Sequence, residues 1–138
     1  MSGFLLDTNV VSELRKAERA DAGVRRWMAT HIDDELWLSV LVVGELRRGV
    51  ALIRRRDPNA ATSLETWLDR LLEQYEDRVL PVTIRVAQRW AAITVPDPVP
   101  IIDGLLAATA IEHGLILLTR NTDDVASTGV TSLNPFTG

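Results

Sequence analysis

The chain has 138 residues, no cysteine, 46% hydrophobic residues and a formal net charge of −4, which predicts one ordinary globular domain over residues 1–138. The lack of cysteine excludes thiolate chemistry and disulfides, and the negative charge argues against a surface that coats nucleic acid broadly. Neither a signal peptide nor an apolar run of membrane-spanning length is visible, so we expect a cytoplasmic protein without membrane association.

Apolar periodicity and turn-forming residues divide the chain into alternating strand-like and helix-like segments. In chain order we predict a strand at residues 3–7, helices at 10–16 and 22–30, a strand at 35–39, helices at 40–54 and 59–75, a strand at 78–82, helices at 84–93 and 102–113, a strand at 115–118 and an edge strand at 131–133. Strands that alternate with helices predict an α/β fold with a central parallel sheet of four or five short strands flanked by helices.

Local signals define several of these boundaries. We expect Asn9 to cap the first helix and Thr83 to cap the helix after the third strand. Residues 94–100 hold three prolines and are expected to form a loop, and residues 119–125 are expected to form a polar turn. The helix at 102–113 is apolar on almost every side, which is typical of a helix buried in the core.

Asp7 lies at the expected carboxyl end of the first strand, where an apolar run changes abruptly into polar residues. Ligands of open α/β sheets bind at this end, because the strand ends and the loops that follow them form a crevice. Taken alone, however, Asp7 is better explained as the N-cap of the next helix.

Further polar residues occupy comparable positions, each with a simpler explanation of its own. Glu45 lies in the long helix at the edge of its apolar stripe, where pairing with a neighbouring arginine would account for it. Asp103 opens the buried helix, where the helix dipole favours a carboxylate. Asn121 and Asp124 directly follow the fourth strand, as turn residues often do.

Considered together, these positions predict a site for a hard cation. Asp7, Asn121 and Asp124 follow strand ends, and Asp103 begins the helix that leads into one of those strands. Oxygen ligands without sulfur suit Mg²⁺ or Mn²⁺, and Mg²⁺ characteristically binds few carboxylates together with substrate phosphates. The chemistry indicated is metal-assisted attack of water on a phosphodiester.

Four segments, in order and over nearly the whole length, resemble the motifs of the PIN-domain ribonucleases, and among them the VapC toxins of bacterial toxin–antitoxin pairs. These segments are Leu6-Asp7-Thr8-Asn9-Val10-Val11-Ser12-Glu13, then Leu38-Ser39 with Val43-Gly44-Glu45-Leu46-Arg47-Arg48-Gly49, then Asp103-Gly104-Leu105-Leu106-Ala107-Ala108-Thr109-Ala110, and then Leu118-Thr119-Arg120-Asn121-Thr122-Asp123-Asp124, with Asn134-Pro135-Phe136 as the ending.

The resemblance implies a PIN-like fold and a metal-dependent endoribonuclease that cleaves RNA to inhibit translation and growth. It implies Asp7, Glu45, Asp103 and Asp124 as catalytic acids, and Asp7, Asp103, Asn121 and Asp124 as ligands of Mg²⁺ or Mn²⁺. The fourth acidic position stays open between two residues. Relatives carry Asp at the position of Asn121, or Asn there with an acid three residues later, as Asp124 is here.

The expected mechanism gives each polar residue a role. Glu45 orients the attacking water or helps accept its proton, while the metal lowers the pKa of that water and offsets charge in the transition state. Four side chains beside the acids are candidates for contact with the scissile phosphate: Thr8, Asn9, Thr119 and Arg120.

The resemblance also implies partners: an RNA substrate, a VapB-like antitoxin, and a homodimer that assembles with the antitoxin. An antitoxin arginine that paired with Asp7 or Asp103 would displace the metal. Large apolar residues within 22–37 and in the helix at 59–75, such as Trp27 and Trp67, are candidates for an interface. The alternative is that they complete the core.

Three other classes stay open at this point. A phosphotransferase of the haloacid-dehalogenase type also begins with Asp after a strand, but it needs a second Asp where Asn9 stands. A metal-dependent nuclease that acts on DNA or in RNA processing would use the same acids. In a non-catalytic binding module the acids would serve only as helix caps. Metal-dependent RNA cleavage distinguishes the expected activity from a phosphotransferase, a DNA-directed nuclease and a binding module.

Overall fold

A five-stranded parallel sheet forms the centre of the computed structural model, which describes residues 2–31 and 35–137. Its order is β3-β2-β1-β4-β5. The strands are β1 Phe4–Leu6, β2 Leu36–Ser39, β3 Val79–Leu80, β4 Ile116–Leu118 and β5 Ser132–Leu133. The predicted α/β fold with a parallel sheet of short strands is therefore confirmed.

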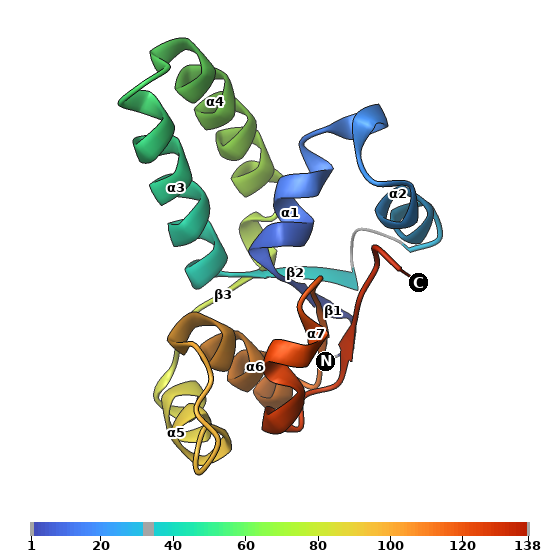
Figure 1. The fold of residues 1–138 in the computed structure, drawn as a ribbon, viewed down its shortest axis with the longest axis vertical. Helices are drawn as coiled ribbons and strands as arrows, with labels where there is room; N and C mark the ends of the chain where they lie inside the picture. Colours follow the sequence, from blue (N-terminus) through green and yellow to red (C-terminus); the bar gives the residue numbers. More distant parts are fainter. Residues whose placement is uncertain (1, 32–34, 138) are drawn as a thin grey trace.

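Helices cover both faces of this sheet. On one side in Figure 1 lie α1 Thr8–Leu14, α2 Ala22–Ala29, α3 Val40–Arg54 and α4 Pro58–Gln74; on the other lie α5 Ile84–Ile93, α6 Ile101–His113 and α7 Thr122–Val125. Short 3₁₀ helices occupy η1 Ala17–Arg19, η3 Glu76–Arg78 and η4 Ala126–Thr128. The helix α3 packs along α4, and α5 packs along α6. Among the described helices, none combines the length and apolarity that crossing a membrane requires.

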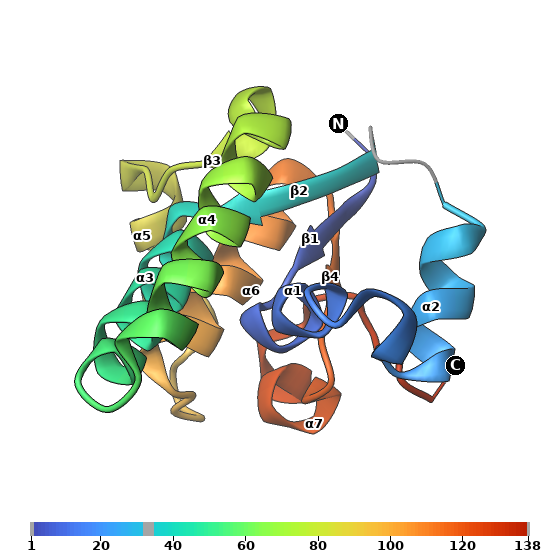
Figure 2. The same ribbon diagram turned by 90° about the horizontal axis from the view of Figure 1, so that it is seen from above.

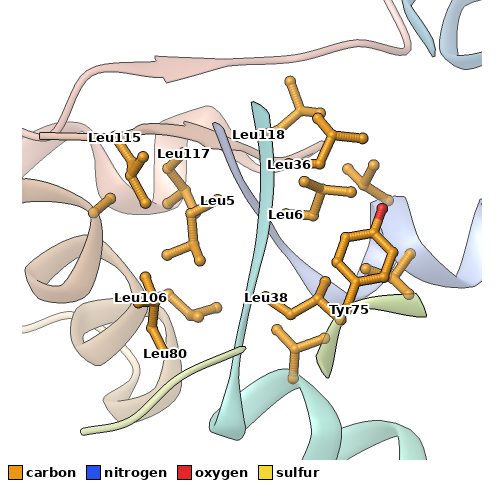
Figure 3. Close-up of a cluster of buried hydrophobic side chains, with 14 of the residues drawn as sticks. Leu5, Leu6, Leu36, Leu38, Tyr75, Leu80, Leu106, Leu115, Leu117 and Leu118 are labelled. Carbon is orange, nitrogen blue, oxygen red and sulfur yellow. The ribbon is translucent and has the colours of Figure 1, made fainter. Parts of the chain in front are cut away.

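The core lies on both faces of the sheet, which explains why the strands are apolar at consecutive positions. Leu5 and Leu117 are paired in register and lie on the same side of the sheet as Leu106 of α6 (Figure 3). Leu6 and Leu118, the next pair along these strands, lie on the opposite side (Figure 3). All five side chains are almost completely buried.

Most of the predicted boundaries are confirmed to within one or two residues, with three informative differences. The third strand is shorter than predicted at both ends, because residue 78 belongs to η3 and β3 ends before Pro81, which has no N–H to donate. Part of the predicted turn closes into α7, where the N–H of Asp124 donates to the carbonyl of Asn121 at 3.1 Å. Asp7 caps α1 instead of Asn9, because its backbone is still extended and its carboxylate accepts the N–H of Thr8.

The apolar residues that we considered for an interface are mostly part of the monomer. Trp27 and Leu71 are each 8% exposed and belong to the core, so the alternative is confirmed for them. Trp67 is half-buried, and residues 32–34 lie outside the described residues. In the described part of the chain, the large hydrophobic side chains that are exposed lie elsewhere: Val40, Leu52, Val82, Ile84, Val95 and Ile101.

Candidate active site

The polar residues that follow β1 and β4 meet at one edge of the sheet, because these two strands are parallel neighbours. The ladder extends to Asp7, whose N–H donates to the carbonyl of Leu118 at 2.9 Å. Figure 2 shows α1, α6 and α7 around this edge, and α6 packs against both strands as well as against α7. Three of the four segments that carry predicted acids therefore converge here.

Asp7 is a buried carboxylate, 8% exposed, that is held from both sides. Its Oδ1 accepts the N–H of Thr8 at 2.7 Å, and its Oδ2 accepts the hydroxyl of Thr119 at 2.8 Å and the amide of Asn9 at 3.3 Å. Burial raises the pKa of Asp7 above its ordinary value, these hydrogen bonds partly counter the rise, and the negative charge of Glu45 adds to it. Asp7 is thus a helix cap and also a fixed, desolvated acid.

Glu45 joins the same site from α3, the helix that follows β2. Its Oε1 accepts the hydroxyl of Thr8 at 2.5 Å. Because Thr8 also donates its backbone N–H to Asp7, this one residue couples the two acids. A pair with a neighbouring arginine was the simpler explanation of Glu45. Arg47, one of these neighbours, pairs with Asp69 of α4 instead.

Asp103 is placed by the close packing of α5 on α6. It lies in the first turn of α6 and is half-buried. A Cβ atom at the adjacent Gly104 would lie 3.0 Å from ring atoms of Trp90 and from the methyl group of Thr94. Glycine at this position therefore allows the first turn of α6, which carries Asp103, to lie closely against the end of α5.

The acids influence one another at Asp103. Burial raises the pKa of its carboxyl, and the charges of Asp7, Asp124 and Glu45 raise it further, in that order. Like charges disfavour ionisation only when they are near, so the four carboxylates share one electrostatic environment. They come from four separate segments of the chain.

Asn121 and Asp124 contribute differently. The backbone N–H of Asn121 donates to the hydroxyl of Thr119 at 3.0 Å, and Asn121 occupies the N-cap position of α7 without a capping bond from its side chain. Asp124 is exposed and raises the pKa of Asp103. This coupling favours Asp124 as the fourth acid, and the assignment stays a prediction.

The four residues that we considered for contact with the phosphate are all at this edge, but three have a further role that the sequence did not reveal. Thr8 holds Glu45, while Asn9 and Thr119 hold Asp7. Arg120 is exposed and donates its backbone N–H to Oδ1 of Asn9 at 3.1 Å. Their contact with substrate stays a prediction. The sequence did contain a signal for this holding role. Thr8 and Asn9 follow Asp7 at the end of β1, and Thr119 directly follows β4, the strand that pairs with β1.

The donor chemistry of the site fits a hard divalent cation, although the acids do not form a closed cage. Within residues 2–31 and 35–137, no group of three or more His, Cys, Asp or Glu side chains is arranged so that it could hold a metal ion by itself. Mg²⁺ does not require such a cage, because it keeps several waters and binds through one or two carboxylates. Four mutually repelling carboxylates supply the charge that such an ion would neutralise.

A cleft of about 380 Å³ opens beside the acids, between α1, α3 and α4. Thr8 and Glu45 form part of its wall, so the cleft is continuous with the acidic site. The remaining lining includes a basic pair, Arg15 and Lys16, and an apolar group that comprises Leu46, Ile53, Leu64 and Trp67.

Comparison with known proteins gives consistent matches. Residues 4–129 match the family described as PIN domain. The chain is 35% identical to VapC ribonuclease Y4jK of Sinorhizobium fredii over 96% of this chain and 97% of that protein, and 33% identical to Toxin FitB of Neisseria gonorrhoeae over 96% and 98%. The crystal structure of FitAcB from Neisseria gonorrhoeae matches with a TM-score of 0.87, at 33% identity over 96% of this chain and 98% of that chain.

The raised pKa of Asp103 predicts how the metal-free protein responds to substitution. Ionising a carboxyl whose folded-state pKa is raised favours unfolding, so the penalty is absent below the ordinary value of 3.8 and grows as the pH rises through the raised value. We expect Asp103→Asn to raise the melting temperature at pH 7 in the presence of chelator, and the gain to shrink as the pH falls toward 4. A lower melting temperature at pH 7 would mean that the favourable interaction of Asp103 with the α6 dipole dominates instead.

Proposed function

The chain belongs to the PIN-domain family, in the group that includes VapC and FitB toxins, and on that premise we propose that it is a divalent-metal-dependent endoribonuclease, the toxin of a toxin–antitoxin pair that inhibits translation and growth. The names of its relatives, a VapC ribonuclease and a toxin, support the nuclease and toxin parts of this proposal. The metal dependence and the RNA substrate are argued from the site.

One observation carries the proposal: the acids lie near one another at one edge of the sheet, where burial and then the charges of Asp7, Asp124 and Glu45 raise the pKa of Asp103. Such a concentration of negative charge repels a polyanionic substrate, and a divalent cation removes this conflict. Asp7 and Asp103, together with Asp124 or Asn121, would hold that cation. When bound, the cation activates water and neutralises charge that develops on the scissile phosphate.

The protein groups around the cation would orient the reactants. Thr8 fixes Oε1 of Glu45, so that Oε2 is available to orient the attacking water and accept its proton. Thr119 and Asn9 hold Oδ2 of Asp7 and keep the direction of that carboxylate constant. Arg120, exposed at the same edge, is the side chain that we assign to an RNA phosphate.

The cleft beside the acids is where we place the antitoxin. Its apolar wall, with Leu64 and Trp67, suits a peptide segment, and its end at Glu45 would bring an antitoxin arginine close to the acids. An arginine paired with Asp7 or Asp103 would take the place of the cation. We also propose that the toxin is a homodimer, as the resemblance to VapC toxins implies.

The proposed activity is tested first by its metal requirement. We expect the purified protein to cleave single-stranded RNA with Mg²⁺ or Mn²⁺ and to lose this activity in excess chelator. Asp7→Asn and Asp103→Asn should each lower kcat by about 10²-fold or more, the scale on which removal of one transition-state-stabilising group acts. DNA of the same sequence serves as the control substrate. Full activity in chelator would contradict the metal dependence, and cleavage of DNA alone would contradict the RNA assignment.

The fourth acidic position is tested by titration with Mn²⁺. We expect Asp124→Ala to weaken Mn²⁺ binding more than Asn121→Ala, because a carboxylate contributes charge to the site and an amide does not. Calorimetric titration of both variants beside the wild type measures the difference. A larger effect of Asn121→Ala would assign the position to the amide.

The toxin assignment is tested in cells. Expression of the chain alone should arrest growth, expression of Asp7→Asn should not, and co-expression of the antitoxin should relieve the arrest. Gly49 lines the cleft, and in the described part of the chain a Cβ atom there would meet nothing within 4 Å apart from its chain neighbours and its own helix backbone. Gly49→Leu would therefore place a side chain in the cleft. We expect the antitoxin to relieve arrest by Gly49→Leu less well. Harmless expression of the folded wild type would count against a toxin.

A further inference from the structure

The segment Asn134–Phe136 resembles the usual ending of the family, and it has no role in the mechanism above. It follows β5, and β5 lies beside β4 at the edge that carries the acids. The backbone ladder between these strands continues to Thr119, whose N–H donates to the carbonyl of Leu133 at 3.0 Å. At the next residue a side chain continues the connection between the two segments: Nδ2 of Asn134 donates to the carbonyl of Arg120 at 3.2 Å.

The ring of Phe136 holds the same arginine from another direction. The guanidinium carbon of Arg120 lies 3.9 Å from the centre of this ring, a cation–π contact. A turn sets the position of the ring, because Oδ1 of Asn134 accepts the N–H of Phe136 at 2.8 Å. Asn134 and Phe136 therefore fix both the backbone and the side chain of Arg120.

Arg120 in turn connects to the most buried acid. Its N–H donates to Oδ1 of Asn9 at 3.1 Å, and Nδ2 of Asn9 donates to Oδ2 of Asp7 at 3.3 Å. The neighbouring Thr119 donates its hydroxyl to the same Oδ2 at 2.8 Å and accepts the N–H of Asn121 at 3.0 Å. Both side-chain hydrogen bonds to Oδ2 of Asp7 thus depend on where residues 119–121 lie.

The segment also rests on α2. A Cβ atom at Gly23 would lie 2.5 Å from the carbonyl oxygen of Phe136 and 2.8 Å from that of Pro135. Glycine at this position is what lets the segment lie against the first turn of the helix. The segment is consequently enclosed between α2 on one side and Arg120 on the other.

We propose that Asn134 and Phe136 are positioning residues that hold residues 119–121 and, through Thr119 and Asn9, the carboxylate of Asp7. The effect on Mn²⁺ binding and on RNA cleavage rests on the proposed function. The ordering of residues 119–121 does not, so it can be measured on metal-free protein.

The test compares four variants with the wild type. Phe136→Leu keeps an apolar side chain but removes the ring, whereas Phe136→Tyr keeps the ring. Gly23→Ala displaces the segment without deleting any atom from it, and alanine in a helix is otherwise more favourable than glycine. Gly44→Ala is the matched control, since this glycine is exposed in α3 and has open space where the Cβ would lie.

Three quantities are measured: amide hydrogen exchange of Arg120 and Asn121 by NMR without metal, Mn²⁺ affinity by calorimetry, and kcat and KM for RNA. In Phe136→Leu and Gly23→Ala we expect several-fold faster exchange at both amides, several-fold weaker Mn²⁺ binding and a lower kcat. Phe136→Tyr, which keeps the ring, should leave all three quantities at their wild-type values. Gly44→Ala should raise the melting temperature and leave the exchange rates at Arg120 and Asn121 unchanged.

The contrary outcome is equally specific. If Phe136→Leu lowers the melting temperature while exchange at Arg120 and the Mn²⁺ affinity match those of the wild type, the segment only packs against the fold and the proposal is wrong. If the wild type fails to cleave RNA at all, the proposed function fails, and the exchange rates still decide whether the segment positions the site.

Discussion

The mutual repulsion of four carboxylates is the constraint on which the site depends. Asp7, Glu45, Asp103 and Asp124 come from different segments, and the charges of the other three raise the pKa of Asp103. Without a counterion this arrangement opposes folding at neutral pH. The rest of the fold must therefore hold these acids in place, and the proposed cation would offset the repulsion among them.

The fold holds the acids with groups that do not themselves carry charge. A buried parallel sheet brings the ends of β1 and β4 together, and the leucines on both of its faces anchor those ends. Hydroxyl and amide donors then fix the carboxylates, with Thr8 on Glu45 and Thr119 on Asp7. Both donors adjoin the ends of β1 and β4, so the strand end that carries Asp7 and its neighbour also supply the supports of Asp7 and Glu45.

The sequence was sufficient to predict the sheet, but it did not reveal the contacts that the candidate acids make. Apolar runs such as residues 4–6 define buried strands directly, and polar residues after them identify the edge. From the sequence alone, Asp7 could be either a helix cap or a residue of the site. In the structure Asp7 caps α1 and lies at the same edge as the other acids. The bond from Thr8 to Glu45 spans 37 residues, so local pattern could not reveal it. The contact of Gly104 with Trp90 likewise depends on how two helices pack.

The central claim is that these acids form one cation site, and crystallography with Mn²⁺ tests it most directly. Anomalous diffraction from crystals grown with saturating Mn²⁺ locates the ion without any assumption about activity. We predict an anomalous peak between the carboxylates of Asp7 and Asp103, with Asp124 or Asn121 on its third side. A well-ordered site at this edge with no ion between Asp7 and Asp103, at Mn²⁺ concentrations that support RNA cleavage, would contradict the claim.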